Sequence, residues 1–323
     1  MRSPRRIILA HNLEKSRGTG GGVSRYSLMR ALWVWGVIGV LFAGPTWADD
    51  LPEIRSKAAV VIDAETGTEI FSKRADEVRP IASTTKIFVA MAVRSRGLDL
   101  DSWTKITRQD AEAARGGSRT RLDIGRSFRN RDLLRAMLIA SDNRAPTAVG
   151  RGAGLDRNQL IAAMNKVAKD LGLTHTTFTD PSGLHGNVST AREMAIALKA
   201  ALEDDVLRSI MGEQHVEIVS KDRRKRIGYT NTNQPLMARK YTVIGGKTGF
   251  TTPAGYCFIT GARFDRKKVV MAFLGADGKL TRFGDFNRVA AWLERGAPGA
   301  KLSDVRRRQR PAPRQPRGRV AAP

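Results

Sequence analysis

The 323-residue chain contains one cysteine, Cys257, and four histidines that are scattered along it. A single thiol excludes an intramolecular disulfide framework, and it excludes zinc or iron–sulfur sites built from several cysteines. The histidines form no H-E-x-x-H pair, so the sequence does not predict a zinc hydrolase. These absences argue against a metal centre.

Acidic residues are scarce relative to basic ones: 31 Asp and Glu stand against 56 Lys and Arg, a formal net charge of +25. Residues 1–48 carry seven basic residues and one acidic residue, and residues 301–323 carry eight and one. About +12 therefore remains on the body of the chain. This excess predicts attraction to polyanions, which include nucleic acid, acidic lipid and anionic cell-wall polymer.

A run long enough to cross a bilayer comfortably is also missing, because the uncharged apolar stretch at 31–44 is too short. Arg25 and Arg30 precede this stretch, and the small-x-small sequence at 46–48 follows it. The pattern predicts that residues 1–48 are a signal peptide; an uncleaved membrane anchor or a buried helix are the alternatives.

Export would place the protein in the periplasm or on the outer face of the cytoplasmic membrane. Nucleic acid is then excluded as a partner. The basic surface would instead make electrostatic contact with anionic polymers or lipids of the envelope.

The body of the chain mixes both kinds of secondary structure, and we expect one α+β domain over residues 49–300. Residues 301–323 are rich in Arg and Pro and are predicted to be a disordered tail. The apolar patterns predict a hairpin over 58–71, helices over 84–96, 133–140, 160–171, 190–202 and 286–294, and strands over 241–244, 256–263 and 268–274. Thr190 and Glu193 are spaced as a capping box.

The first chemically suggestive motif is Ser83-Thr84-Thr85-Lys86, which an apolar helical run follows. A spacing of three residues puts Ser83 and Lys86 on one helix face. The amine can accept the hydroxyl proton only if its pKa is lowered, by burial or by a second cation. A second S-x-x-K at 102–105 has no apolar run after it, and we interpret it as a chance match.

Two further motifs follow, Ser141-Asp142-Asn143 and Lys247-Thr248-Gly249. The first could place a hydroxyl and an amide in one cleft, or could be only a helix C-terminal turn. The second is not a phosphate loop, because position 241 is Tyr where that motif needs Gly. Its glycines would let a ligand approach a strand closely, although a tight turn is the alternative.

The three motifs in this order resemble the penicillin-recognising serine enzymes. The flanking stretches I-A-S-T-T-K, S-D-N-R-A, D-P-S-G-L-H-G-N-V-S-T-A-R-E, N-T-N and G-K-T-G-F-T-T-P-A-G-Y-C resemble the D-alanyl-D-alanine peptidases of the peptidase S11 family, over about residues 52–297. The resemblance is greatest to the short endopeptidase branch, the penicillin-binding protein 7 type. It implies a β-lactamase/transpeptidase-like fold, an antiparallel sheet flanked by helices with a helical subdomain.

The resemblance also implies the chemistry. Peptidoglycan stem peptides would be the substrates, β-lactam antibiotics would be covalent inhibitors, and no cofactor would be needed. A serine D-Ala-D-Ala carboxypeptidase or endopeptidase would work through an acyl-enzyme on Ser83. The implied catalytic residues are Ser83, Lys86 and Ser141, and the implied substrate-binding residues are Asn143, Lys247, Thr248, Gly249, Phe250, Thr251 and Arg282. Ser83 and Phe250 would supply the two oxyanion-hole N–H groups.

Arg282 bears on the type of peptidase. In the carboxypeptidase branch an Arg ten residues before a helical Trp holds the free terminal carboxylate, and Arg282 stands ten residues before Trp292. A solvated charge at the start of a helix is the alternative for Arg282. Two rival functions also remain open, a class A-like β-lactamase and a non-catalytic basic cell-wall-binding protein.

Benzylpenicillin separates the β-lactamase from the peptidase. No Glu lies between Asn143 and Glu193, where a class A β-lactamase needs one to activate the deacylating water. We expect penicillin to acylate Ser83 and to remain bound, which mass spectrometry of the intact protein would detect as a persistent adduct. Rapid turnover of benzylpenicillin would contradict this prediction.

Overall fold

Residues 51–118 and 120–296 are described by the structure, a computed structural model. The predicted signal peptide at 1–48 and the predicted tail at 301–323 lie outside these residues. The part of the chain that the structure describes has no helix with the length and apolar character needed to cross a membrane.

The central element is a five-stranded antiparallel sheet with the strand order β2-β1-β11-β10-β9. Its strands are β1 (Ala58–Asp63), β2 (Glu69–Lys73), β9 (Thr242–Thr251), β10 (Gly255–Phe264) and β11 (Lys267–Ala276). The hairpin and the three late strands predicted from the sequence are therefore confirmed. The two ends of the chain's body meet in this sheet, because β1 pairs with β11 from Ala58↔Leu274 to Asp63↔Val269. In this strand order, β9 forms one edge of the sheet.

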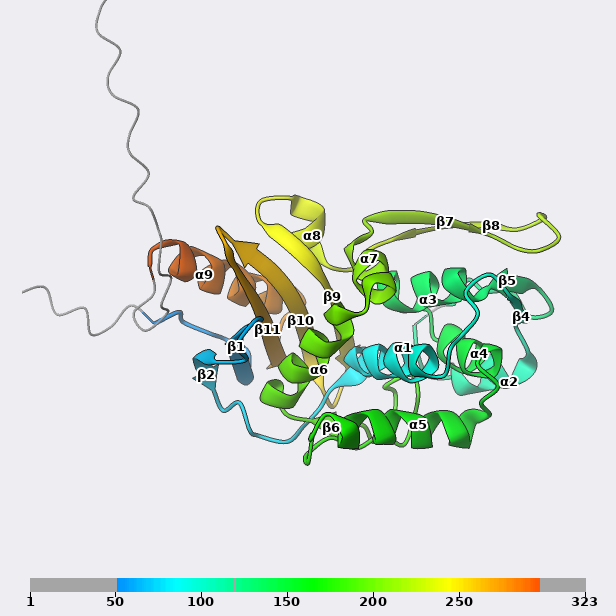
Figure 1. Ribbon diagram of the computed structural model, residues 1–323, viewed down its shortest axis with the longest axis horizontal. Coiled ribbons are helices and arrows are strands. Elements are labelled where there is room, and N and C mark those ends of the chain that lie inside the picture. The colour runs from blue at the N-terminus through cyan, green and yellow to red at the C-terminus, as the bar shows by residue number, and fades with distance from the viewer. Residues whose placement is uncertain (1–50, 119, 297–323) are drawn as a thin grey trace, which may run out of the picture. The chain divides into compact units, whose positions relative to one another are not determined.

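Both faces of the sheet are covered, which explains why all six residues of β1 are buried. Successive side chains of a strand point to opposite faces. Val60 and Ile62 belong to the apolar core on the side of α6 (Ala191–Glu203), whereas Val61 belongs to the smaller core on the side of α9 (Thr281–Glu294). Figure 1 shows α9 and α6 on opposite sides of the strands.

The remaining helices form a helical subdomain beside the sheet, as the resemblance implied (Figure 1). Its centre is α1, which begins at Lys86 directly after a single 3-10 turn, η1. The elements are η1 (Ala82–Thr85), α1 (Lys86–Ser95), α2 (Arg108–Ala113), α3 (Asn130–Ile139), α4 (Ala145–Gly152), α5 (Arg157–Asp170) and α7 (Asp205–Gly212). The short helix α8 (Gln234–Ala238) packs instead against β9 and α9. The predicted helices are present, but α3, α5 and α9 each begin three to five residues earlier than the apolar pattern indicates.

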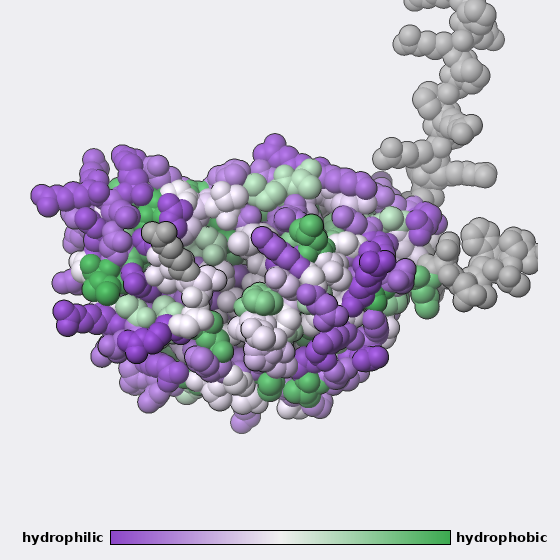
Figure 2. All heavy atoms as spheres, turned by 180° about the vertical axis from the view of Figure 1, so that it is seen from behind, coloured by the Kyte–Doolittle hydropathy of each residue, from purple (hydrophilic) through white to green (hydrophobic). Residues whose placement is uncertain are grey.

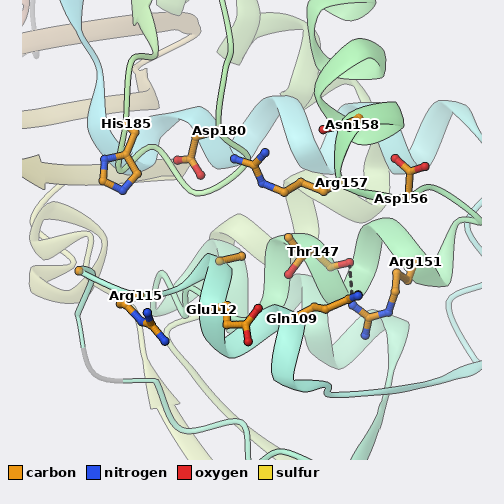
Figure 3. A pocket seen from close by; sticks show the side chains of 12 residues that line it. Gln109, Glu112, Arg115, Thr147, Arg151, Asp156, Arg157, Asn158, Asp180 and His185 are labelled. Atoms are coloured by element: carbon orange, nitrogen blue, oxygen red, sulfur yellow. Dashed lines mark hydrogen bonds between the residues drawn. The ribbon is translucent and has the colours of Figure 1, made fainter.

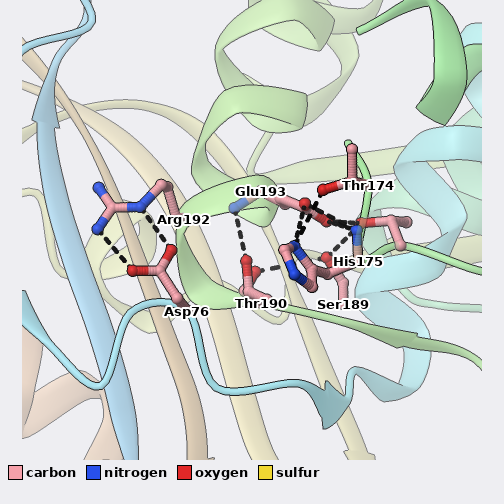
Figure 4. A network of polar contacts seen from close by, with 8 residues as sticks. Asp76, Thr174, His175, Ser189, Thr190, Arg192 and Glu193 are labelled. Carbon is pink, nitrogen blue, oxygen red and sulfur yellow. Dashed lines mark hydrogen bonds and ion pairs between the residues drawn. The ribbon is translucent and has the colours of Figure 1, made fainter. Parts of the chain in front are cut away.

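The helix α6 begins with only half of the predicted capping box. The Thr190 side chain accepts a hydrogen bond from the Glu193 backbone N–H, at 3.1 Å, as the motif requires. The Glu193 carboxylate turns instead toward the preceding loop, where it accepts from the His175 backbone N–H and the Thr176 hydroxyl, at 2.9 and 2.6 Å (Figure 4). Because the Glu193 carboxylate and Thr176 are buried and both carboxylate oxygens bind the loop, the carboxylate stabilises the loop rather than the helix end.

Several elements were not predicted from the sequence. They are the short pairs β3 (Arg79–Pro80) with β6 (Val188–Ser189) and β4 (Trp103–Lys105) with β5 (Ser127–Arg129), and the hairpin of β7 (His215–Val219) with β8 (Arg226–Thr230). The second S-x-x-K motif runs into β4, and its Ser102 and Lys105 are exposed. It therefore lacks the helical context of the first, which agrees with a chance match.

Asp285 joins the N-terminal end of the body to α9. Its fully buried carboxylate accepts from the backbone N–H and the hydroxyl of Ser56, at 2.8 and 2.5 Å, and is paired with Arg288. We expect Asp285→Ala to lower the free energy of unfolding by about 3 kcal/mol, since buried donors lose their acceptor. Chemical denaturation measures this, with Asp277→Ala as control, because the Asp277–Lys57 pair is exposed and should contribute less than about 1 kcal/mol. Equal effects of the two variants would contradict the prediction.

Candidate active site

Ser83 and Lys86 meet at the junction of η1 and α1. In a 3-10 turn, side chains three residues apart lie nearly above one another. The Lys86 Nζ is accordingly 2.7 Å from the Ser83 Oγ. Ala82, just before the serine, has φ +49°, a left-handed value that non-glycine residues seldom adopt and that surrounding contacts must hold.

The Lys86 amine is fully buried, and two other oxygens bind it. They are the Asn143 Oδ1 at 2.7 Å and the Ser182 carbonyl at 2.8 Å. A neutral amine has two N–H donors and one lone pair, so two donors can satisfy these oxygens while the lone pair faces the Ser83 hydroxyl. The geometry suits an amine that accepts the serine proton.

Burial lowers the pKa of Lys86 to about 7, because the charged form loses its hydration. The carboxylates of Asp180 and Asp142 oppose this effect by favouring the charged form. The balance leaves an appreciable neutral fraction of the amine near neutral pH. Desolvation, rather than a neighbouring cation, is thus the main cause of the lowered pKa that a proton acceptor needs.

The Lys247-Thr248-Gly249 motif lies within β9, at the edge of the sheet next to η1, and not in a turn. Lys247 is fully buried, and its Nζ donates to the Thr248 carbonyl at 2.8 Å. Burial holds the pKa of Lys247 well below its usual value, and the charges of Lys86 and Arg282 lower it further. The Thr248 hydroxyl lies 2.7 Å from that of Thr232, a residue of the N-T-N stretch to which sequence reasoning gave no role.

Gly249 allows the edge strand to approach the nucleophile. A Cβ at this position would lie 2.9 Å from the Ser83 backbone nitrogen and 3.0 Å from the Ala82 Cβ, both closer than ordinary contact. The absence of a side chain therefore brings the β9 backbone against η1.

The Ser141-Asp142-Asn143 motif forms the loop between α3 and α4. Asp142 anchors it, because its buried carboxylate accepts from the Arg121 backbone N–H at 2.8 Å and the Tyr229 hydroxyl at 3.0 Å. Ser141 takes a left-handed φ of +63°. Its hydroxyl has no hydrogen-bond partner within the described residues, so it remains available to a ligand.

The loop 180–187 is a part of the site to which sequence reasoning assigned no role. Its Ser182 carbonyl contacts both the Lys86 amine and, at 3.3 Å, the Ser83 hydroxyl. The Asp180 carboxylate accepts from the Ser182 and Leu184 backbone N–H groups and holds this turn. Gly183, with φ +81°, has its hypothetical Cβ only 2.0 Å from the Ala82 carbonyl oxygen, so glycine is required there. The D-P-S-G-L-H-G-N stretch covers this loop in the sequence, and it is the signal from which a role for the loop could have been predicted.

Arg282 lies near the same edge of the sheet and is buried, so it is not a solvated charge at a helix start. Its guanidinium lies 4.8 Å from the centre of the Tyr256 ring, which in turn stacks on the half-exposed Phe250 ring at 4.3 Å. The Arg282 Nη1 is 3.5 Å from the Gly249 carbonyl oxygen. Burial lowers the pKa of Arg282 to about 10, so it stays cationic at neutral pH.

The last candidate, Thr251, is the final residue of β9. Thr251 accepts a hydrogen bond from the Ala254 backbone N–H, at 3.3 Å, and this contact helps close the turn to β10. The structure thus brings Lys86 and Asn143 together with Ser83, and it places Lys247, Thr248, Gly249, Phe250 and Arg282 at the neighbouring end of β9. Ser141 lies in the same loop as Asn143, two residues before it. Within residues 51–118 and 120–296, no group of three or more potential ligands could hold a metal ion.

A serine, a buried amine within hydrogen-bond distance of it and a Lys-Thr-Gly edge strand, on an α+β fold with a helical subdomain, define a serine hydrolase of the β-lactamase/transpeptidase type. The family model of the S11 peptidases, described as D-alanyl-D-alanine carboxypeptidase, matches residues 46–278. The chain belongs to this family, which confirms the resemblance predicted from the motifs. It is a D-Ala-D-Ala carboxypeptidase/endopeptidase-type hydrolase, and it acts in the cell envelope.

Individual relatives agree with this assignment. The chain is 33% identical to a D-alanyl-D-alanine endopeptidase of Pseudomonas aeruginosa, over 76% of this chain and 79% of the relative. It is also 33% identical to a D-alanyl-D-alanine endopeptidase of Escherichia coli, over 78% and 83%. Among solved structures, the Streptomyces K15 DD-transpeptidase matches with a TM-score of 0.70 and 26% identity, over 75% of this chain and 97% of that one.

The pKa of Lys86 predicts how acylation depends on pH. Because the amine must be neutral to accept the Ser83 proton, and its pKa is about 7, the acylation rate should rise as pH increases through about 7. Labelling with a fluorescent penicillin between pH 5 and 9 measures this rate. Lys86→Arg, which stays protonated throughout, should remove the rise and slow labelling at least about 100-fold. A rate that stays flat over this range in the wild type would contradict the role of the amine.

Proposed function

We propose that the protein hydrolyses D-alanyl bonds of peptidoglycan stem peptides through an acyl-enzyme on Ser83, and that β-lactams acylate the same hydroxyl. The observation that carries this proposal is the 2.7 Å contact between the Ser83 Oγ and a Lys86 amine that is fully buried. Such an amine can take the hydroxyl proton as the oxygen attacks the carbonyl of the penultimate D-Ala.

Negative charge then develops on the carbonyl oxygen. The backbone N–H groups of Ser83 and Phe250 would stabilise it as an oxyanion hole, in which one donor commonly contributes about 3 kcal/mol. The close approach of Gly249 to the Ser83 backbone nitrogen supports this role, because Phe250 follows Gly249 directly on β9.

Departure of the leaving amine needs a proton. Ser141 would relay this proton, since its hydroxyl has no hydrogen-bond partner within the described residues. Lys247 would polarise the Ser141 hydroxyl. Asn143 would orient Lys86 through their 2.7 Å hydrogen bond and bind the substrate amide, while Thr248 would bind the substrate. Gly249 and Thr251 would shape the strand that the substrate follows. Water then hydrolyses the ester and frees Ser83.

Arg282 would decide how well the enzyme accepts a free terminal carboxylate. It is a cation beside the end of β9, held by the Tyr256 ring. A carboxypeptidase benefits from such a charge, whereas an endopeptidase cleaves a bond whose leaving group extends into a second peptide. We propose that the enzyme performs both reactions and that Arg282 favours the first.

Location and surface charge complete the proposal. Residues 1–48 would be the signal peptide that exports residues 49–300, the peptidase domain, to the periplasm or the outer face of the cytoplasmic membrane. Exposed basic residues at the turn of the β7–β8 hairpin, among them Lys221, Arg223 and Arg224, would contact anionic polymers or lipids of the envelope. Figure 2 shows hydrophilic side chains gathered toward this end of the molecule, at the left of the view.

Digestion of purified muropeptides, followed by mass spectrometry, tests the reaction. We expect the wild type to release one D-Ala from monomers and to convert crosslinked dimers to monomers, and Ser83→Ala to do neither, with a loss of at least about 1000-fold. Arg282→Gln should slow D-Ala release about tenfold or more while crosslink cleavage is retained, because only the first reaction presents a free carboxylate.

The digestion also separates the rival function. Full cleavage by Ser83→Ala would require a different nucleophile and would overturn the proposal. No cleavage by the wild type, together with binding to the purified wall, would favour a non-catalytic wall-binding protein.

A further inference from the structure

A groove of about 520 Å³ lies where the central sheet extends past the end of α6. Near that end Leu202 packs against β10, since a Cβ added at Gly261 would lie 2.6 Å from the Leu202 Cδ1. The helix ends at Glu203, and further along the two strands Arg263 and Lys268 are exposed. Both of these cations line the groove.

The groove is remote from the catalytic centre. Ile244 lines it, whereas Gly249 lies against Ser83. Ile244 and Gly249 are five positions apart on β9, which corresponds to about 17 Å at about 3.3 Å per residue. A ligand in the groove therefore leaves the Ser83 hydroxyl accessible.

The charges that line the groove are unbalanced. A larger groove of about 860 Å³, between α2 and the start of α5, provides a comparison, because its lining has three arginines and three carboxylates (Figure 3). The groove beyond α6 has two more cations than carboxylates. Its charged lining residues are the cations Lys199, Arg208, Arg263 and Lys268 and the carboxylates Glu65 and Glu203.

Two of the cations face each other across the sheet. Arg263 on β10 and Lys268 on β11 are direct partners in the antiparallel register. Side chains at such positions have Cβ atoms about 5 Å apart, and like charges there repel. The residues that continue this row, Thr242 on β9 and Ala64 after β1, are uncharged. An anion bound between Arg263 and Lys268 would relieve their repulsion.

The other two cations are already engaged. Lys199 pairs with Glu203 at 2.7 Å, and Arg208 pairs with Asp205 and donates from Nη1 to the Leu202 carbonyl at 2.9 Å. Within the described residues, the side chains of Arg263 and Lys268 have no ion pair or hydrogen bond. Their donors are therefore available to a ligand.

The lining is also partly apolar. Its apolar side chains are those of Ala64, Leu202, Ile244 and Val270. A bare inorganic anion gains little from such surface, whereas carbon atoms attached to the anion can be buried against it. The groove thus suits an anionic group that carries an organic part.

We propose that this groove binds a phosphate ester, with the phosphate between Arg263 and Lys268 and the organic part on the apolar side chains. A guanidinium binds two phosphate oxygens in a planar fork, and an ammonium group binds another as a compact charge. The tetrahedral phosphate can accept from both cations at once. Lipid headgroups and soluble phosphate esters share this chemistry. The inference goes beyond the peptidase reaction and does not depend on it.

Calorimetry of the purified protein with glycerol 3-phosphate tests the site. We expect saturable binding at one site, tighter than that of inorganic phosphate because of the apolar contacts. Arg263→Gln and Lys268→Gln should each weaken it about tenfold, the size expected for a charge-assisted hydrogen bond. Glu65→Gln should tighten it, because Glu65 is a carboxylate of the lining without an ion pair in the part of the chain described.

Two variants serve as matched controls. Arg266→Gln removes an exposed cation two residues from Lys268 that does not line the groove, and Arg157→Gln removes one from the groove of Figure 3. Both should keep the affinity for glycerol 3-phosphate within about twofold of the wild type. The melting temperature of Arg263→Gln, expected to be unchanged or higher because a like-charge contact is removed, excludes unfolding as the cause of its weaker binding. Equal losses in Arg263→Gln and Arg266→Gln, or the absence of saturable binding, would overturn the proposal.

Vesicles distinguish the two sources of the phosphate. If the ligand is a lipid headgroup, Arg263→Gln should lower cosedimentation with vesicles of phosphatidylglycerol and phosphatidylcholine in equal parts, and Arg266→Gln should not. If both variants cosediment as the wild type does while glycerol 3-phosphate binding still depends on Arg263, the ligand is a soluble phosphate ester. Either result supports the site. These measurements involve no peptide cleavage, so a failure of the proposed reaction would not affect them.

Discussion

Exclusion of water from the Lys86 amine is the constraint on which the rest of the site depends. An exposed lysine would be protonated at neutral pH and could not accept the Ser83 proton. Burial lowers its pKa to about 7 against the opposing field of Asp180 and Asp142. Without this desolvation, the 2.7 Å contact would join the hydroxyl to a protonated amine, which could not accept its proton.

Three segments far apart in the sequence maintain that environment. The loop after α3 supplies the Asn143 oxygen, the 180–187 loop supplies the Ser182 carbonyl, and β9 closes the site from the edge of the sheet. Carboxylates that play no direct chemical role hold the first two in place. Asp142 accepts from the Arg144 backbone N–H in its own loop and from that of Arg121 outside it, and Asp180 accepts from the Ser182 backbone N–H. Positioning by buried, hydrogen-bonded loops gives a geometry that solvent-exposed loops could not keep.

The sequence predicted the elements whose patterns are local. β1 is an uninterrupted apolar run, and the helix at α6 begins at a Thr that accepts from a backbone N–H three residues later. The starts of α3 and α5 were placed late because their first three residues are polar. The start of α9 was placed late because its first turn contains only one apolar side chain, that of Phe283. The β7–β8 hairpin was missed because much of it is exposed and because residues 221–225, which join its strands, are all charged. The Glu193 carboxylate was misplaced because its partners lie in another loop, which a capping pattern does not contain.

For the site, the sequence by itself determined the identity of the three motifs and the proximity of Ser83 and Lys86, because three residues of helical turn bring their side chains together whatever the rest of the chain does. Only the tertiary structure decided that the amine is buried, that the Ser182 carbonyl and Thr232 join the site, and that Arg282 is inside rather than in solvent. The physical reason is that the burial of a side chain, and its contacts with distant segments, depend on neighbours from many parts of the chain. A local sequence pattern does not contain information about those neighbours.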